Sequence, residues 1–156
     1  MENFEFIEYV KKEFNFLITE FDFKIEKEIK DQLVYGVLYK NTSKAIQVYY
    51  EVLDQLSFVM IFRLNNGELP AWDDTANAVP LHKISDFVST VYEIDKSVLP
   101  PAFDRDTYKK NSVLNDLNKK ARSLKRIAKI IITDKKWISF PEIDKPQSPT
   151  VWNPED

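Results

Sequence analysis

The sequence predicts an α+β domain in which a mainly antiparallel sheet of four or five strands is packed by an N-terminal helix and a long, basic C-terminal helix. Residues 33–64 contain three runs of β-branched and aromatic residues separated by short polar turns, which is typical of strands joined by hairpins. Residues 3–18 and 107–132 repeat apolar side chains at spacings of three and four, as amphipathic helices do. We expect one domain over residues 1–140 and an extended, proline-containing tail over residues 141–156.

The first element is expected to be a helix over residues 3–18, with Asn3 as its N-cap. Glutamates and lysines occupy one face of this helix, and the other carries an apolar stripe of Phe4, Ile7, Val10, Phe14 and Leu17. Residues 21–26 then alternate apolar and charged side chains. This alternation predicts a first strand that runs on towards residue 31.

The three central strands are expected within residues 33–40, 45–52 and 57–64. Because side chains alternate between the faces of a strand, the second run has one face that is wholly β-branched or aromatic and one that is mixed. The third run is apolar on both faces over most of its length, so we place it centrally. Three tyrosines are expected on the less apolar face: Tyr35, Tyr39 and Tyr49. They belong to the core if a helix covers this face, and they form a patch suited to protein recognition if no helix covers it.

Beyond residue 64 the chain alternates connections and helices. Asn65-Asn66-Gly67 predicts a turn, and residues 65–82 form a connection long enough to suggest a role of its own. Helices are expected over residues 84–94 and 107–132, followed by a short strand over residues 137–140. The apolar stripe of the longest helix consists of Val113, Leu117, Ala121, Leu124, Ala128 and Ile131.

The composition excludes several kinds of chemistry. The chain has two glycines, too few for a Rossmann fingerprint or a P-loop. It has no cysteine, which removes disulfides, thiolate metal sites and cysteine nucleophiles. His82 is the single histidine, so a two-histidine metal site cannot form, and no serine or threonine stands in a known nucleophile motif. We therefore expect a non-enzymatic protein with no catalytic residue, metal or cofactor.

The connection over residues 65–82 carries the first candidate site, Trp72-Asp73-Asp74. An exposed aromatic residue beside acidic residues is typical of an anchor that binds a protein partner, and core packing of Trp72 is the competing interpretation. Adjacent carboxylates also suit a divalent cation. However, no third ligand stands at a fixed spacing, so a solvated loop is the simpler interpretation of the two aspartates.

Charge is distributed unevenly along the chain. The net charge is −3, yet residues 108–137 hold ten of the 22 lysines and arginines and only two acidic residues. Five of these basic residues share or flank one helical face, because they recur at spacings of three and four: Lys119, Arg122, Lys125, Arg126 and Lys129. Such a face is consistent with a solvated or internally paired surface, with a protein partner, or with nucleic acid bound along residues 109–136.

Four segments in the first half of the chain resemble those of a known class of proteins. They are residues 21–23 (FDF) after a helix, residues 37–41 (VLYKN), residues 46–51 (IQVYYE) and residues 62–70 (FRLNNGELP). In this order they resemble small uncharacterised bacterial proteins, some of which are similar to immunity proteins of polymorphic toxin systems. The shared motifs are packing and turn patterns, so the resemblance implies no functional residue.

The missing catalytic constellation, the acidic residues outside the basic helix and this resemblance favour a protein-binding protein. We expect an immunity-type protein that neutralises a bacterial toxin by occluding it, with Trp72, Asp73 and Asp74 as its first candidate contacts. Nucleic-acid binding through residues 109–136 is the alternative. No stretch has the form of a signal peptide or the length of a membrane-spanning helix, so a cytoplasmic protein without a membrane partner is expected.

Overall fold

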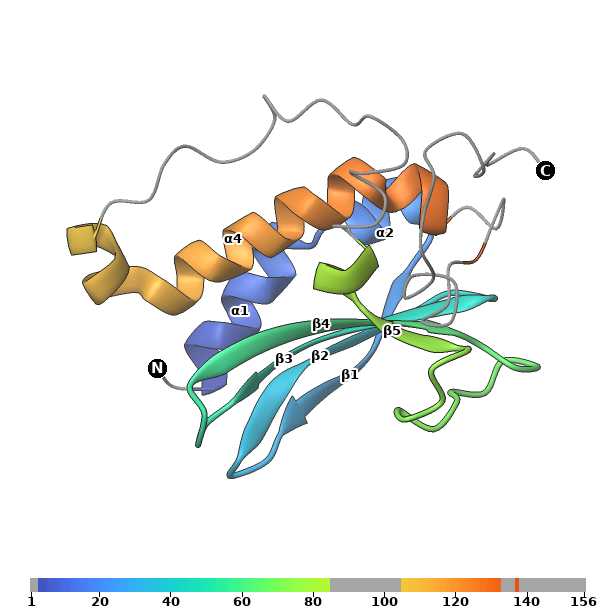
Figure 1. Ribbon diagram of the computed structural model, residues 1–156, viewed down its shortest axis with the longest axis horizontal. Helices are drawn as coiled ribbons and strands as arrows, with labels where there is room; N and C mark the ends of the chain where they lie inside the picture. Colours follow the sequence, from blue (N-terminus) through green and yellow to red (C-terminus); the bar gives the residue numbers. More distant parts are fainter. Residues whose placement is uncertain (1–2, 85–104, 133–136, 138–156) are drawn as a thin grey trace.

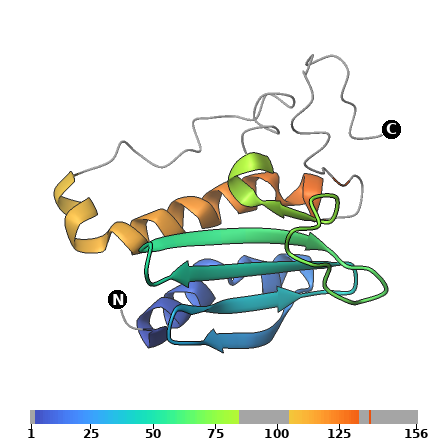
Figure 2. The ribbon, with the colours of Figure 1, turned by 60° about the horizontal axis from the view of Figure 1, so that its bottom comes forward.

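The computed structural model describes residues 3–84, 105–132 and 137. A five-stranded antiparallel sheet forms one layer, and helices pack on one of its faces as the second layer (Figures 1 and 2). The elements are α1 (Asn3–Glu13), α2 (Phe16–Phe21), β1 (Lys24–Lys30), β2 (Val34–Lys40), β3 (Lys44–Glu51), β4 (Leu56–Arg63), β5 (Ala78–Pro80) and α4 (Arg105–Ile131). The predicted α+β class is confirmed, with five strands in the sheet.

The strands follow one another in chain order across the sheet, β1-β2-β3-β4-β5. From β1 to β4 this order arises because short turns leave the chain no alternative to antiparallel pairing with the preceding strand. In the β2–β3 turn, the Asn41 side-chain oxygen accepts hydrogen bonds from the amides of Ser43 and Lys44, at 3.0 and 2.7 Å. Asn65 and Glu68 exchange two backbone hydrogen bonds of 2.9 Å, which confirms the turn predicted at the end of β4.

The main core lies between the sheet and the helices. Side chains on one face of the sheet pack against those of α1, α2 and α4. The largest fully buried side chains of this core include Phe6, Phe14, Leu17, Tyr39, Ile46, Ile61, Leu117 and Leu124. The Tyr39 hydroxyl points to the carbonyl oxygen of Val10 at 3.5 Å. A Lys11–Glu28 ion pair of 2.7 Å also joins α1 to β1 at the surface.

The helix predicted over residues 3–18 is interrupted. α1 ends at Glu13 and a second short helix, α2, runs from Phe16 to Phe21. The break changes the direction of the chain, so that Phe14, Phe16 and Leu17 are all buried. α2 ends where Asp22 adopts a left-handed conformation (φ 59°) and donates its amide to the carbonyl of Leu17. The first strand therefore begins at Lys24 rather than at Phe21, which belongs to α2.

The long helix confirms the apolar stripe read from the sequence. α4 begins at Arg105, and five of the six predicted stripe residues are buried, while Val113 is partly buried against them. Ile127 and Ile132 extend the same buried surface. Within the described residues, no helix is long and apolar enough to cross a membrane.

A fifth strand lies inside what the sequence presents as one long connection. β5 consists of three residues, one of them a proline, and a strand of this length is too short to show an alternating pattern. Its position is set by pairing with residues 60–62 of β4 and by the hydrogen bond from the Arg63 amide to the Asn77 carbonyl, 2.8 Å. The helix expected over residues 84–94, the strand over residues 137–140 and the tail over residues 141–156 lie outside the described residues, apart from Ile84 and Trp137.

Candidate protein-binding surface

The helices cover one face of the sheet, and we call the other the open face (Figure 2). Strand alternation and the register assign its residues in rows that run across β2, β3 and β4. The rows are Val34–Glu51–Leu56, Gly36–Tyr49–Phe58, Leu38–Gln47–Met60 and Lys40–Ala45–Phe62. Most of these side chains are apolar, so the open face is not an ordinary solvated surface.

One half of the open face is a small second core. Leu38, Ala45, Met60, Phe62 and Ala78 are buried together, with Tyr49 and Leu64 packed against them. The connection between β4 and β5, residues 64–77, folds on this side of the sheet at the β5 end (Figure 1).

The other half of the open face presents apolar side chains to solvent. The rings of Tyr49 and Phe58 stack with centroids 5.4 Å apart, and both are only partly buried. Leu56, in the next row, is 53% exposed. An aromatic pair beside an exposed leucine is the kind of surface that becomes the centre of a protein interface.

Two hairpin turns add further leucines at this end of the sheet. Leu53, in the β3–β4 turn, is 79% exposed, and Leu33, in the β1–β2 turn, is 52% exposed. The amide of Val52 donates to the carbonyl of Leu33 at 2.9 Å, so the two turns lie side by side. Single exposed leucines are common, but two from adjacent turns beside a third at the start of β4 form a patch. We call Leu33, Leu53 and Leu56 the leucine edge.

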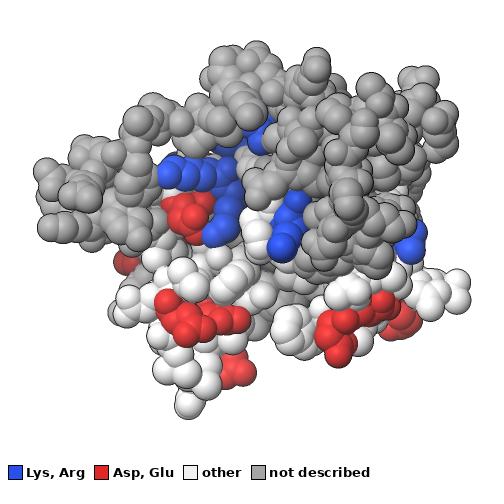
Figure 3. Space-filling view, in the orientation of Figure 1, with Lys and Arg blue, Asp and Glu red and all other residues white. Residues whose placement is uncertain are grey.

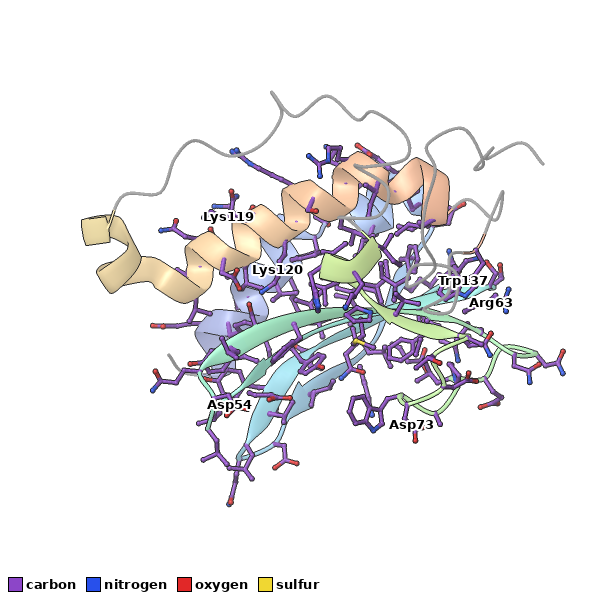
Figure 4. The ribbon with its side chains drawn as sticks, viewed as in Figure 1. Asp54, Arg63, Asp73, Lys119, Lys120 and Trp137 are labelled. Atoms are coloured by element: carbon purple, nitrogen blue, oxygen red, sulfur yellow. The ribbon has the colours of Figure 1, made fainter. Side chains whose placement is uncertain are left out.

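Acidic side chains accompany this patch. Glu51 lies on the open face beside Leu56, and burial, reinforced by a hydrogen bond and the charge of Asp54, raises the pKa of Glu51. Asp54 and Asp73 lie on the side of the sheet away from the helices, towards opposite ends (Figure 4). The two lower groups of charged side chains in Figure 3 are both acidic. A partner that approaches from this side therefore meets apolar groups flanked by negative charge.

The structure separates the roles of the three predicted contact residues. Trp72 is 76% exposed, so its packing into the core, the competing interpretation, is wrong. Asp73 is exposed as well. Asp74 instead stabilises its own connection, because its carboxylate accepts hydrogen bonds from the Ala76 amide and the Asn77 side chain, at 3.2 and 2.9 Å.

We call Trp137, Arg63 and Lys44 the clasp, because together they hold the same connection against the end of the sheet. The Trp137 indole donates to the carbonyl of Ala76 at 2.6 Å, and the guanidinium of Arg63 lies 5.5 Å from the centre of its ring (Figure 4). Arg63 also donates to the Asn77 side chain at 2.9 Å, and Lys44 approaches the indole from β3 at 6.0 Å. The connection that carries Trp72 is thus fixed at its C-terminal end.

The three tyrosines expected on one face are divided between two. Register pairs Tyr35 with Tyr50, and both rings contact Phe6 of α1 with centroids 5.6 Å away. Tyr35 and Tyr39 are therefore core residues, and Tyr49 alone of the three reaches the open face. The sequence alone does not show which face each tyrosine occupies, because the register depends on how two strands pair and not on either strand by itself. Phe58 and the leucine edge were not predicted either, although leucines in short turns are a usable signal of exposure.

The basic face of α4 is partly paired within the molecule. Lys120 points to the sheet and donates to the Ser57 carbonyl at 2.8 Å and to the Asp116 carboxylate (Figure 4). Lys125 lies 3.7 Å from Glu20. Of the five predicted nucleic-acid contacts, Arg122 is exposed, Arg126 is partly buried and Lys119 lies on the outer side of α4. The side chain of Lys129 is outside the described part of the chain.

The described residues contain no group of three histidine, cysteine, aspartate or glutamate side chains able to hold a metal ion. The amine of Lys120 lies 3.1 Å from the Ser57 hydroxyl, as in a serine nucleophile that a lysine activates. However, the Asp116 carboxylate accepts hydrogen bonds from both the Lys120 amine and the Ser57 hydroxyl. Ser57 is also buried, so this trio joins α4 to β4. His82 is exposed.

Comparison of the chain with protein-family models, with curated proteins and with solved structures finds no match.

Proposed function

We propose that this protein is a non-enzymatic binding protein that covers a functional surface of another protein with its open face, as an immunity-type protein covers a toxin. One observation carries the proposal. The uncovered half of the open face combines the Tyr49–Phe58 ring pair with the leucine edge, although the chain has a helical layer that buries the other face. Apolar groups left exposed on a preformed sheet favour association with a partner.

The dimensions of the sheet suit this role. The four longer strands extend up to about 26 Å and span about 14 Å, so this face measures roughly 370 Å², and the second core occupies one half of it. The leucine edge and the connection that carries Trp72 enlarge this area. The leucine edge and this connection must therefore supply a large part of the roughly 800 Å² per partner that stable complexes bury.

The charges predict the chemistry of the partner. Glu51, Asp54 and Asp73 flank the apolar groups towards β4, whereas Lys24 and Lys27 lie on the margin of the open face formed by β1. We therefore expect a partner with an apolar centre and with lysines or arginines that face the β4 side. Because the pKa of Glu51 is raised, its negative charge is lost at higher pH than that of an ordinary glutamate. The affinity for such a partner should fall as the pH falls through the pKa of Glu51.

The test is capture of the partner by the full chain and by variants of the exposed side chains. Leu53→Glu and Trp72→Ala change the proposed surface without touching the core, and Ile18→Glu is a matched control on an exposed apolar residue of α2. A protein that wild type and Ile18→Glu retain, and that both Leu53→Glu and Trp72→Ala lose, supports the proposal. Co-expression should then protect cells from that protein. Equal retention by all four chains, or capture without protection, rejects occlusion through this face.

Nucleic-acid binding along α4 is the second candidate, and the exposed Arg122 is the observation that favours it. Such binding should weaken steeply with salt, because counterions released from the nucleic acid drive it. Replacement of Arg122, Lys125 and Arg126 by glutamine should abolish the binding of an oligonucleotide. Binding that persists in this triple variant rejects the candidate.

A further inference from the structure

A groove of about 380 Å³ lies in the helical layer, away from the open face. It runs between α4 on one side and α1 and α2 on the other, helices that lie against each other in Figure 1. The polar and aromatic side chains that line it are Lys12, Glu13, Phe16, Asn118, Arg122 and Lys125.

Two helices bring cations to this groove. On α4, Asn118, Arg122 and Lys125 are spaced by four and three residues, so they share one face. That face meets α1 where the side-chain amide of Asn118 donates to the Glu13 carboxylate at 2.9 Å. Lys12, which precedes Glu13 in α1, also lines the groove, from the side opposite α4.

The Glu13 carboxylate, which lines the groove, already has hydrogen-bond partners. Besides Asn118, the Glu13 carboxylate interacts with Tyr9, whose pKa is raised by burial and by that neighbouring charge. Lys125 lies 3.7 Å from Glu20 and 5.8 Å from the centre of the Phe16 ring. Within the described residues, neither Lys12 nor Arg122 has a hydrogen-bond or ion-pair partner. Three cations and the Glu13 carboxylate thus line one small space, so the lining carries an excess of positive charge that an anion would offset.

We propose that this groove binds a phosphate group. The guanidinium of Arg122 can donate two parallel hydrogen bonds to phosphate oxygens, and Lys12 and Lys125 add point charges. The volume lies at the lower end of small-molecule sites, which suits a pyrophosphate or one nucleotide. The same phosphate chemistry is found in a free ligand and in a nucleic-acid backbone. The site is independent of the open face and does not rest on the proposed binding of a protein.

The experiment titrates the full chain with inorganic pyrophosphate at low ionic strength by calorimetry. Replacement of both Lys12 and Arg122 by glutamine should weaken binding at least about tenfold, because two charge-assisted contacts are lost. The matched control replaces Lys24 and Lys83 by glutamine, which removes the same net charge. These are exposed lysines of β1 and of the segment after β5, and neither lines the groove. This control should leave the affinity nearly unchanged. Glu13→Gln should tighten binding, since it removes the negative charge of the groove.

A single-stranded oligonucleotide, titrated in parallel, distinguishes the two sources of phosphate. Pyrophosphate binding that depends on Lys12 and Arg122 supports a small-ligand site, and oligonucleotide binding alone with the same dependence supports a nucleic-acid backbone in the groove. Equal losses in the groove variant and in its charge-matched control overturn the proposal, as does the absence of binding to either probe. The unfolding midpoint of each variant shows whether the fold is retained.

Discussion

The chain has two glycines, and Gly36 provides the sharpest test of the sheet on which the open face depends. Gly36 of β2 pairs with Tyr49 of β3. A Cβ atom at Gly36 would lie 2.1 Å from the carbonyl oxygen of Val48 and 2.7 Å from the Cα of Tyr49. Both atoms belong to the backbone, so no side-chain rotation could relieve the contact. In the variant Gly36→Ala, β2 and β3 must move apart.

The size of the effect follows from this geometry. Restoring an ordinary contact requires the strands to separate by about 1 Å, which lengthens the neighbouring ladder hydrogen bonds beyond useful range. Overpacking of this kind costs about 1–3 kcal/mol, and each lost hydrogen bond adds about 1 kcal/mol. We therefore expect Gly36→Ala to lower the free energy of unfolding by about 2–4 kcal/mol.

Gly67→Ala is the matched control. Gly67 has a φ of 80°, and nothing lies within 4 Å of the position that a Cβ atom would take, so its replacement costs only the backbone strain of about 1 kcal/mol. Urea unfolding followed by circular dichroism measures both variants against wild type. A change of less than about 0.5 kcal/mol for Gly36→Ala would refute the register, because such values are typical of unconstrained surface sites. It would also remove the basis for placing Tyr49 and Phe58 on the open face.

Three further predictions concern the core, alkaline pH and the clasp. Leu124→Ala should cost about 3–5 kcal/mol in urea unfolding, because Leu124 is fully buried on the apolar face of α4. Leu69→Ala, at an exposed position, should cost less than about 1 kcal/mol, and equal costs would contradict the packing. Burial raises the pKa of Tyr39, so the stability this gives is present below the unfolded pKa of about 10 and is lost as the pH rises above it. Tyr39→Phe should therefore move the alkaline unfolding midpoint upward, and an unchanged midpoint in a tyrosinate absorbance titration would argue against this burial. Trp137→Ala removes the hydrogen bond to Ala76 and should speed amide exchange in residues 74–78 while α1 stays protected; unchanged exchange would show that the clasp does not hold the connection.

The candidate surface was only partly visible in the sequence. A long connection with an aromatic residue directs attention to Trp72, and the structure leaves this side chain exposed. Asp73 and Asp74 look alike in the sequence, yet the Asp74 carboxylate accepts hydrogen bonds from Ala76 and Asn77. Phe58 belongs to a run that is apolar on both faces, so no pattern indicates which of its faces the helices leave open.

The sequence by itself determined the elements that depend on local periodicity. The alternating runs specify three strands and their turns, and the spacing of three and four specifies the buried stripe of α4, because these patterns arise within one segment of chain. Contacts between distant segments decided the rest. α1 breaks at Phe14 so that Phe16 also reaches the core, β5 exists because β4 offers it a pairing edge, and register sends Tyr35 inward while Tyr49 faces out. Which face of the sheet the helices cover, and hence which apolar side chains stay exposed on the other, is a property of that packing and of no single stretch of sequence.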